Sequence, residues 1–170
     1  MASVSADYAA VGEGAAAFAR SLAPPTPQTS YTSSIVGSVT SGMIANGQAK
    51  FIEVGCVACH TQSHTTGNSI LTGQTGVTYS SWSDYALHNM GVTLRDGLSF
   101  GSAGPQDFRT PALWGSGQRH FFMHDGRDTD LNGAIQDHKS TGSEANAVVD
   151  LFNALSTADQ QDVLNFLRSL

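Results

Sequence analysis

Cys56-Val57-Ala58-Cys59-His60 is the stretch of sequence on which the rest of the chain depends. The Cys-x-x-Cys-His spacing is the pattern that attaches a c-type haem. Two thiols three positions apart lie on one side of a helical turn, where each can form a thioether with one vinyl group of the same porphyrin. The next residue, His60, then offers an imidazole nitrogen to the iron as its proximal ligand. The motif therefore predicts one covalently bound haem c.

Two other interpretations of the cysteine pair fit the rest of the sequence less well. Half of a zinc site would need further paired ligands, and these two cysteines are the only ones in the chain. A thioredoxin-like redox pair normally opens a helix after a strand, and no βαβ pattern surrounds this motif. The context of the motif therefore favours haem.

Composition and charge limit the class of protein. The chain has 170 residues, of which 40% are hydrophobic, enough for one domain with a core of its own. Its formal net charge of −6 argues against nucleic acid as a partner. No run of about 18 apolar residues occurs, so we expect no membrane span. Residues 1–20 lack the basic and apolar regions of a signal peptide.

Hydrophobic periodicity predicts an all-α, cytochrome-c-like fold with long loops and an extra N-terminal helix. We divide the chain into an N-terminal helix with a Pro/Ser/Thr-rich linker, residues 1–40, and a haem domain, residues 41–170. Within the haem domain we expect helices over 41–54, 81–89 and 143–155, a short helix capped by Asp128 or Thr129, and a last helix from Ser156. Gly47 would let another helix or the porphyrin approach closely. Residues 61–79 are expected to form a loop.

The first and last predicted helices share an ending. Phe18-Ala19-Arg20-Ser21-Leu22 follows a stripe that includes Tyr8 and Val11, and the chain ends in Phe166-Leu167-Arg168-Ser169-Leu170. Two interpretations are open. The match is a coincidence between two amphipathic helices, or the first helix closes an earlier haem domain whose body is not in this chain.

A haem bound through His60 needs a second axial ligand, and His138 is the leading candidate. Leu131, Ala134, Ile135 and His138 share one face of a short helix by their spacing. A histidine on an apolar helix face is usually a core residue, but here a metal requires a ligand. Met90, His88 and His124 are the alternatives.

Two arginines are candidates for the haem propionates. Arg109 and Arg127 could pair with a propionate or with nearby aspartates. The competing interpretation is that both are ordinary surface arginines.

Four stretches together resemble a known family. They are Gly55-Cys56-x-x-Cys59-His60-Thr61, Ser83-Asp84-Tyr85-x-x-His88-Asn89-Met90-Gly91, Phe108-Arg109-Thr110-Pro111-Ala112-Leu113-Trp114-Gly115 and Phe122-Met123-His124-Asp125-Gly126-Arg127. Over about residues 41–170 the chain resembles the C-terminal haem domain of the bacterial di-haem oxidoreductases, which are related to di-haem cytochrome c peroxidases. The resemblance implies a cytochrome-c-like fold. It adds Trp114 to the cofactor-binding candidates and makes His124 and Asp125 a turn that braces the haem crevice.

The resemblance also bears on the sixth ligand. In the related peroxidases the C-terminal haem accepts electrons, and its sixth ligand, typically methionine, lies a helix downstream of the His-Asp-Gly motif. The matching position in this sequence is His138, which implies bis-histidine ligation by His60 and His138. Two imidazoles should lower the reduction potential relative to a His/Met haem.

Three functions follow from these expectations. The first is a six-coordinate cytochrome domain that transfers electrons to or from a redox partner protein or another haem domain. The second is a peroxidase-like enzyme whose catalytic haem lies on a missing domain or partner, and the third is a haem subunit of a larger redox assembly. Haem attachment to this motif generally occurs outside the cytoplasm, so we expect a periplasmic or extracellular protein.

Overall fold

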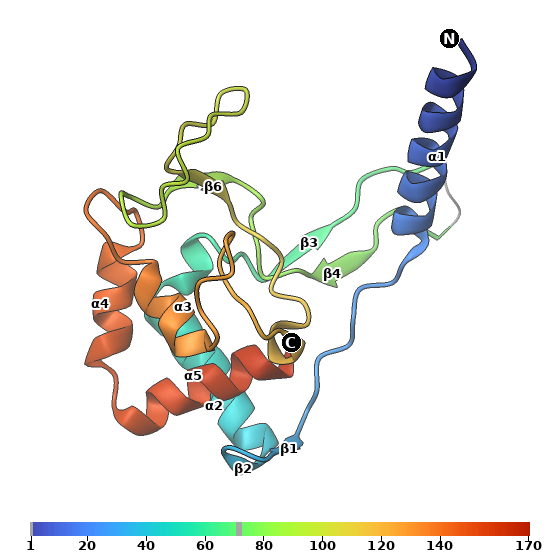
Figure 1. Cartoon of the computed structure of the whole chain (residues 1–170). Helices are drawn as coiled ribbons and strands as arrows, with labels where there is room; N and C mark the ends of the chain where they lie inside the picture. Colours follow the sequence, from blue (N-terminus) through green and yellow to red (C-terminus); the bar gives the residue numbers. More distant parts are fainter. Residues whose placement is uncertain (1, 71–72) are drawn as a thin grey trace.

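The computed structural model describes residues 2–70 and 73–170, and its α-helices other than the first gather on one side of the molecule (Figure 1). In chain order the elements are α1 (Ala2–Ser21), β1 (Tyr31–Ser33), β2 (Gly37–Val39), α2 (Ser41–Glu53), the 3-10 helix η1 (Cys56–Ala58), β3 (Ser63–Thr65), β4 (Thr78–Ser80), β5 (Leu87–Asn89), β6 (Asp107–Arg109), the 3-10 helix η2 (Ser116–Gln118), α3 (Leu131–Asp137), α4 (Asn146–Ala154) and α5 (Thr157–Ser169). Within the described ranges, none of the helices has the length and apolar character required to cross a membrane.

Helices α2 and α5 cross in close contact at Gly47. A Cβ atom added to Gly47 would lie 1.9 Å from the carbonyl oxygen of Asp162 and 2.9 Å from the Cβ of Phe166. Two helix backbones can approach this closely only where one of them carries no side chain. Of the two neighbours expected for Gly47, a helix or the porphyrin, the structure shows the helix.

The hydrophobic core lies beside this crossing. Phe51, Trp82 and Phe166 pack edge to face, with ring centroids 4.9 to 5.7 Å apart. Phe152 of α4 and Leu131 of α3 belong to the same cluster, together with Val163, Leu164 and Leu167 of α5. Each large apolar side chain buried in this way contributes about 1.5–3 kcal/mol to folding. The core therefore fixes α2, α5 and the segment around Trp82 relative to one another.

The expectation of an all-α fold is wrong. In the described residues three two-stranded antiparallel sheets, β1–β2, β3–β4 and β5–β6, accompany the helices, so the fold is mixed. Each strand is three residues long, which is too short for the alternation over about four to eight residues by which strands are recognised in a sequence. The predicted loop 61–79 contains β3 and most of β4, and its residues 71–72 lie outside the described part of the chain.

Residues 81–89, expected to form a helix, are instead irregular and end in β5. Trp82 and Tyr85 adopt left-handed backbone conformations, with φ of 52° and 58°. The Ser83 hydroxyl accepts a hydrogen bond from the Tyr85 N–H, and the Asp84 carboxylate accepts one from the Ala86 N–H, each at 2.9 Å. These local bonds give the backbone partners outside a helix, and this is why helical spacing of the apolar residues misled the prediction.

The helix ends differ from expectation by one to three residues. Side chains that accept a backbone N–H at a helix start are Thr40 on α2, Asp130 on α3 and Ser156 on α5. The last helix was expected to start at Ser156, which is its cap. The cap of α2 lies one residue before the expected helix start at residue 41, and the cap of α3 lies one or two residues after the expected Asp128 or Thr129. Helix α4 is shorter than the predicted range 143–155 at both ends.

Helix α1 extends away from the rest of the molecule (Figure 1). Phe18 and Leu22 at its end are 65% and 59% exposed. Of the predicted stripe, the side chains of Tyr8 and Val11 lie outside the described part of the structure. The ending that α1 shares with α5 therefore occupies a very different environment in the two helices, because Phe166 is buried.

The second half of the predicted linker is packed against α5. The backbone N–H of Gln28 donates to the Ser169 carbonyl at 2.7 Å, and the Tyr31 hydroxyl donates to the Asn165 carbonyl at 3.2 Å. Val39, in the hairpin of β1 and β2, is buried. This segment is therefore joined to the last helix through Gln28 and Tyr31.

Candidate functional site

The Cys-x-x-Cys-His motif forms a tight turn immediately after α2. Gly55 takes a left-handed φ of 95°, and η1 begins at the next residue. The backbone N–H groups of Cys59 and His60 both donate to the Cys56 carbonyl, at 3.3 and 2.9 Å. The turn brings both thiols and the His60 ring to the wall of one cavity.

The two thiols carry no charge at neutral pH. Burial raises the pKa of Cys56 to about 12, and burial is also the main reason that the pKa of Cys59 is raised. Both cysteines are free and partly buried. Neutral thiols add no charge that a large apolar ring would have to desolvate on entering the cavity.

His60 is held in one tautomer by the backbone of Trp82. Its Nδ1 lies 2.9 Å from the Trp82 carbonyl oxygen. Because a carbonyl only accepts, Nδ1 carries the hydrogen and Nε2 keeps its lone pair. Burial lowers the pKa of His60 to about 4, so the ring is neutral at physiological pH. A neutral imidazole with a free Nε2 and a bonded Nδ1 is the form that binds a metal.

His138, at the end of α3, is held in the same tautomer by a backbone carbonyl. It is the C-terminal cap of α3, and its Nδ1 lies 2.6 Å from the Ala134 carbonyl oxygen one turn earlier. Nδ1 therefore donates, and Nε2 is again free. Burial lowers the pKa of His138, which keeps this ring neutral as well.

The two imidazoles lie at a separation that fits a shared metal ion. Their ring centroids are 6.4 Å apart. Since a metal–imidazole bond is about 2.0–2.1 Å long and a ring centroid lies about 1.1 Å from its nitrogen, two imidazoles on opposite sides of one metal have centroids about 6.2–6.4 Å apart. The residues present therefore fit an iron porphyrin held between two histidines and attached by two thiols.

The cavity has the size and polarity of a cofactor site. Its volume is about 440 Å³, within the range of about 300–1,000 Å³ typical of such sites. Its apolar walls include Phe51, Leu94, Phe108, Leu131, Ile135 and Phe152. The alternative ligands Met90, His88 and His124 also line it, and His124 stacks on Phe108 with centroids 4.4 Å apart.

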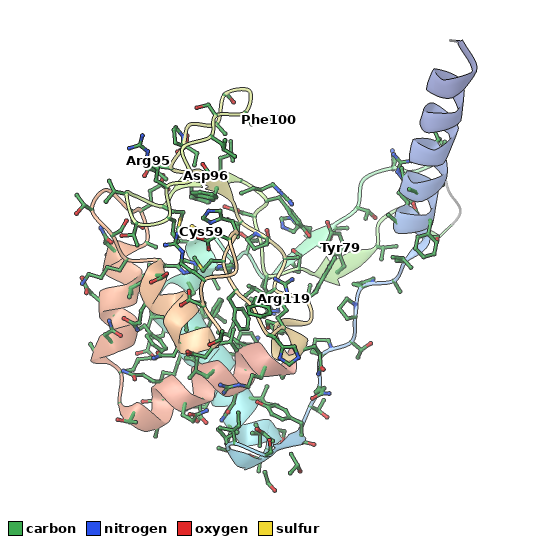
Figure 2. The ribbon with its side chains drawn as sticks, in the orientation of Figure 1. Cys59, Tyr79, Arg95, Asp96, Phe100 and Arg119 are labelled. Carbon is green, nitrogen blue, oxygen red and sulfur yellow. The ribbon has the colours of Figure 1, made fainter. Side chains whose placement is uncertain are left out.

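Two arginines line the cavity, and one of them was not anticipated. Arg109 lies with its guanidinium 5.8 Å from the Tyr85 ring centroid, and Arg119 donates to the Trp114 carbonyl at 3.2 Å. Arg119 and Cys59 lie in the body of the domain, whereas Phe100 lies on the loop between β5 and β6 that extends outward (Figure 2). Arg119 follows a Gly/Ser-rich stretch outside the motifs, so its basic character was its only signal in the sequence.

Arg127 and Trp114 are not among the residues that line the cavity. Arg127 forms an ion pair with Asp125 at 2.6 Å and donates to the Thr93 carbonyl at 2.8 Å. The Trp114 indole N–H donates to the Ser80 carbonyl. Cys56, Cys59, His60, His138 and Arg109 are therefore brought to one cavity, whereas these two predicted residues lie outside it.

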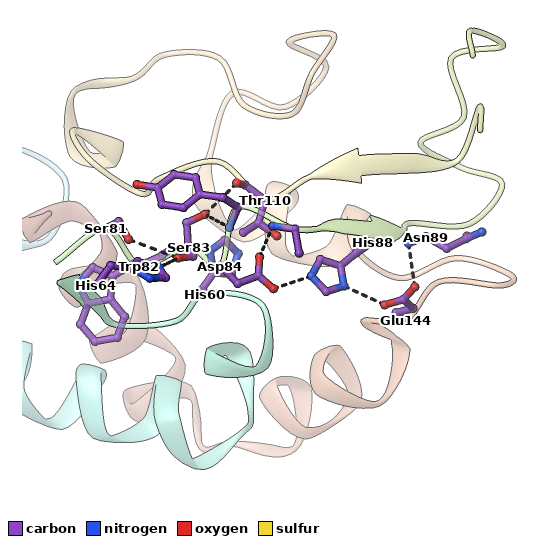
Figure 3. A network of polar contacts seen from close by, with 12 residues as sticks. His60, His64, Ser81, Trp82, Ser83, Asp84, His88, Asn89, Thr110 and Glu144 are labelled. Carbon is purple, nitrogen blue, oxygen red and sulfur yellow. Dashed lines mark hydrogen bonds and ion pairs between the residues drawn. The ribbon is translucent and has the colours of Figure 1, made fainter. Parts of the chain in front are cut away.

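A second feature of the cavity wall is a histidine between two carboxylates (Figure 3). His88 Nε2 lies 2.8 Å from Asp84 Oδ2, and His88 Nδ1 lies 2.9 Å from Glu144 Oε2. The sequence had offered His88 as an alternative iron ligand, but both of its ring nitrogens are engaged here. The Glu144 partner could not be inferred, because it is 56 residues away in the chain, whereas Asp84 lies only four positions before His88.

The chain matches the family model described as "Di-haem oxidoreductase, putative peroxidase" over residues 10–170. No match was found among curated proteins or among solved structures. The matched range contains the cysteine motif, both facing histidines and part of α1.

Proposed function

We propose, because this chain belongs to the di-haem oxidoreductase family, that its cavity holds one c-type haem and that the domain transfers electrons. Cys56 and Cys59 would form the thioethers, and His60 and His138 would be the axial ligands. The observation that carries the proposal is the 6.4 Å separation of two neutral imidazoles that line one cofactor-sized cavity.

Each residue has a defined part in this proposal. When bound, the haem supplies one-electron redox chemistry. The carbonyls of Trp82 and Ala134 fix the tautomers of the two histidines and make them stronger donors. Arg109 and Arg119, both on the cavity wall, are suited to neutralise propionates. Two imidazole ligands favour a lower potential than an imidazole with a thioether.

Electron transfer is preferred over catalysis because both axial positions have a protein donor. The experiment is an intact mass combined with spectra of the purified chain. We expect a gain of one haem over the apo mass, a low-spin haem c spectrum, and no binding of CO. A colourless protein, or high-spin haem that binds CO readily, would contradict the proposal.

A second candidate is a role in a di-haem peroxidase. The family description names two haems and a peroxidase, whereas this sequence has one cysteine pair. Peroxide chemistry would then require a second haem on another domain or partner. Steady-state peroxide turnover with a reduced cytochrome donor tests this. Turnover only after the partner is added supports the role, and turnover by the isolated chain would place the chemistry at the His60 site itself.

The proposed partner is a redox protein or another haem domain, alone or within a larger assembly, and the proposed location is outside the cytoplasm. The location rests on the chemistry of covalent haem attachment. Fractionation of cells that express the protein from its natural gene, followed by detection of covalent haem in each fraction, tests it.

A further inference from the structure

His88 is bonded to a carboxylate at each ring nitrogen. An ionised carboxylate can only accept hydrogen bonds, so Asp84 at 2.8 Å and Glu144 at 2.9 Å each require a hydrogen on the nitrogen that faces them. A neutral imidazole has only one N–H. The geometry therefore calls for His88 in its doubly protonated, positively charged form while both carboxylates are ionised.

The two carboxylates are themselves held in place. Glu144 Oε1 accepts the Asn89 backbone N–H at 2.9 Å, and the Glu144 N–H donates to the Asn89 carbonyl at 2.9 Å. The backbone N–H of Asp84 donates to the Cys59 carbonyl at 2.8 Å. His88 thus joins the haem-attachment turn on one side to the chain just before α4 on the other (Figure 3).

His88 also belongs to the wall of the cavity that contains His60 and His138. Its side chain is 17% exposed, so its charge is only partly screened by water. A positive charge in this wall favours the reduced over the oxidised state of an iron centre in the cavity. By linkage, reduction must in turn favour the protonated state of His88.

We propose that His88, clamped between Asp84 and Glu144, is a redox-linked proton site that takes up a proton when the domain is reduced and releases it when the domain is oxidised. The balance is one electron from an external one-electron donor and a fraction of one proton from solvent. The inference rests on the proposed function, since it needs a redox centre in the cavity. It assigns to His88 a positioning and tuning role rather than a ligand role.

Other ionisable groups near His88 must be separated from it in a test. On its own side of the cavity these are Asp84 and His60, and from the α4 side Glu144. On the paired strand β6 they are Asp107, opposite Asn89, and Arg109, opposite Leu87. Any propionates near Arg109 would titrate as well, but their contribution would survive a change at His88.

The test is the midpoint potential of the haem-loaded protein measured between pH 5 and 10. In the wild type we expect the potential to fall as pH rises through the pKa of His88, which its hydrogen bonds to Glu144 and Asp84 hold above the ordinary histidine value of about 6.5. We expect about a tenfold difference in proton affinity between the two redox states, which corresponds to a fall of about 59 mV. His88→Gln should remove this fall of about 59 mV and leave only the contribution of any propionates. His120→Gln, at an exposed histidine that does not line the cavity, is the matched control and should retain the fall.

Glu144→Gln supplies a second arm. Loss of one carboxylate should move the transition to lower pH, because protonated His88 then has one anionic partner. A flat wild-type profile, or an unchanged profile in His88→Gln, would overturn the inference even if haem is bound. A protein that takes up no haem would overturn the proposed function instead.

A readout that needs no variant is the nitrogen NMR spectrum of the histidine rings. We expect two protonated ring nitrogens on His88 at pH 7. A neutral His88 at that pH, or loss of its proton at a higher pH in the oxidised than in the reduced protein, would count against the inference. We expect the opposite order, in which the oxidised protein loses the proton at the lower pH.

Discussion

His138 is the residue whose replacement tests the ligand set directly. In His138→Met the hydrogen bond to the Ala134 carbonyl is lost and a thioether replaces an imidazole. We expect a changed ligand-field spectrum and a higher reduction potential, because sulfur donates less strongly than nitrogen. Met90→Leu is the control, since Met90 also lines the cavity. A spectrum that changes in the control and not in His138→Met would assign the ligand to Met90.

His88 also sets an expected dependence of stability on pH. Hydrogen bonds first to Glu144 and then to Asp84 raise the pKa of His88. A raised pKa in the folded state gives stability that is complete below about pH 6.5 and is lost as pH rises through the folded pKa. We expect a loss of about 1–2 kcal/mol, modest because Glu144 is half exposed. Urea unfolding between pH 6 and 10, with His88→Gln for comparison, measures it.

The same contacts act in the opposite direction at acid pH. Burial opposes the shift at Asp84, but hydrogen bonds from Ala86, His88 and Thr110 leave its pKa lowered, and the Asn89 N–H with His88 lowers the pKa of Glu144. Their stabilisation is complete above the unfolded pKa values and lost as pH falls through the folded ones. The free energy of unfolding should therefore be greatest at intermediate pH, between the loss at acid pH and the loss at alkaline pH. Unfolding curves measured from pH 3 to 6 should show the loss at acid pH.

At the scale of single residues, local spacing in the sequence was enough to identify several site residues, whereas contacts between residues distant in the sequence could not be predicted. Cys56, Cys59 and His60 lie in one turn, and His138 shares a helix face with Ala134, so short-range patterns were enough to select them. The carbonyl of Trp82 could not be selected, because it reaches His60 from 22 positions away through a left-handed backbone. Arg119 was missed for a related reason, since it reaches the cavity from a segment outside the motifs.

At the scale of elements, the crossing of α2 and α5 offers a matched pair of glycines. Gly47→Ala would place a methyl group 1.9 Å from the Asp162 carbonyl oxygen, so the helices must move apart. We expect a loss of about 3 kcal/mol or more, comparable to severe overpacking in a core. Gly42→Ala, in the same helix, meets only the Thr40 hydroxyl at 3.7 Å and should raise stability slightly. Denaturant unfolding compares them; equal stability would contradict the close crossing.

The elements that the sequence predicted well are those with several turns of periodic apolar residues. Helices α2 and α5 fall within about one residue of their expected limits, because each buries a stripe against the other. The helix predicted for residues 81–89 does not form, because Ser83 and Asp84 accept hydrogen bonds from the backbone N–H groups two residues later. The three small sheets were not predicted, because each strand is only three residues long and gives no recognisable alternation in the sequence.

At the scale of the whole molecule, the candidate site is assembled from parts that are distant in sequence. The attachment turn follows α2, the facing histidine ends α3, and the clamp on His88 joins β5 to the start of α4. Four short segments therefore meet at one cavity that no single motif describes. The family match over residues 10–170 contains all four of these segments.

The shared ending of α1 and α5 provides the last prediction. Phe166 is buried against Phe51 and Trp82, whereas Phe18, at the same place in the shared ending, is 65% exposed. Phe166→Ala should lower the free energy of unfolding by about 3–5 kcal/mol, as expected for a large buried ring. Phe18→Ala should change it by less than about 0.5 kcal/mol, because a surface side chain away from the core contributes little. Urea unfolding of both variants tests this, and an equal loss in both would mean that α1 packs against the domain in solution.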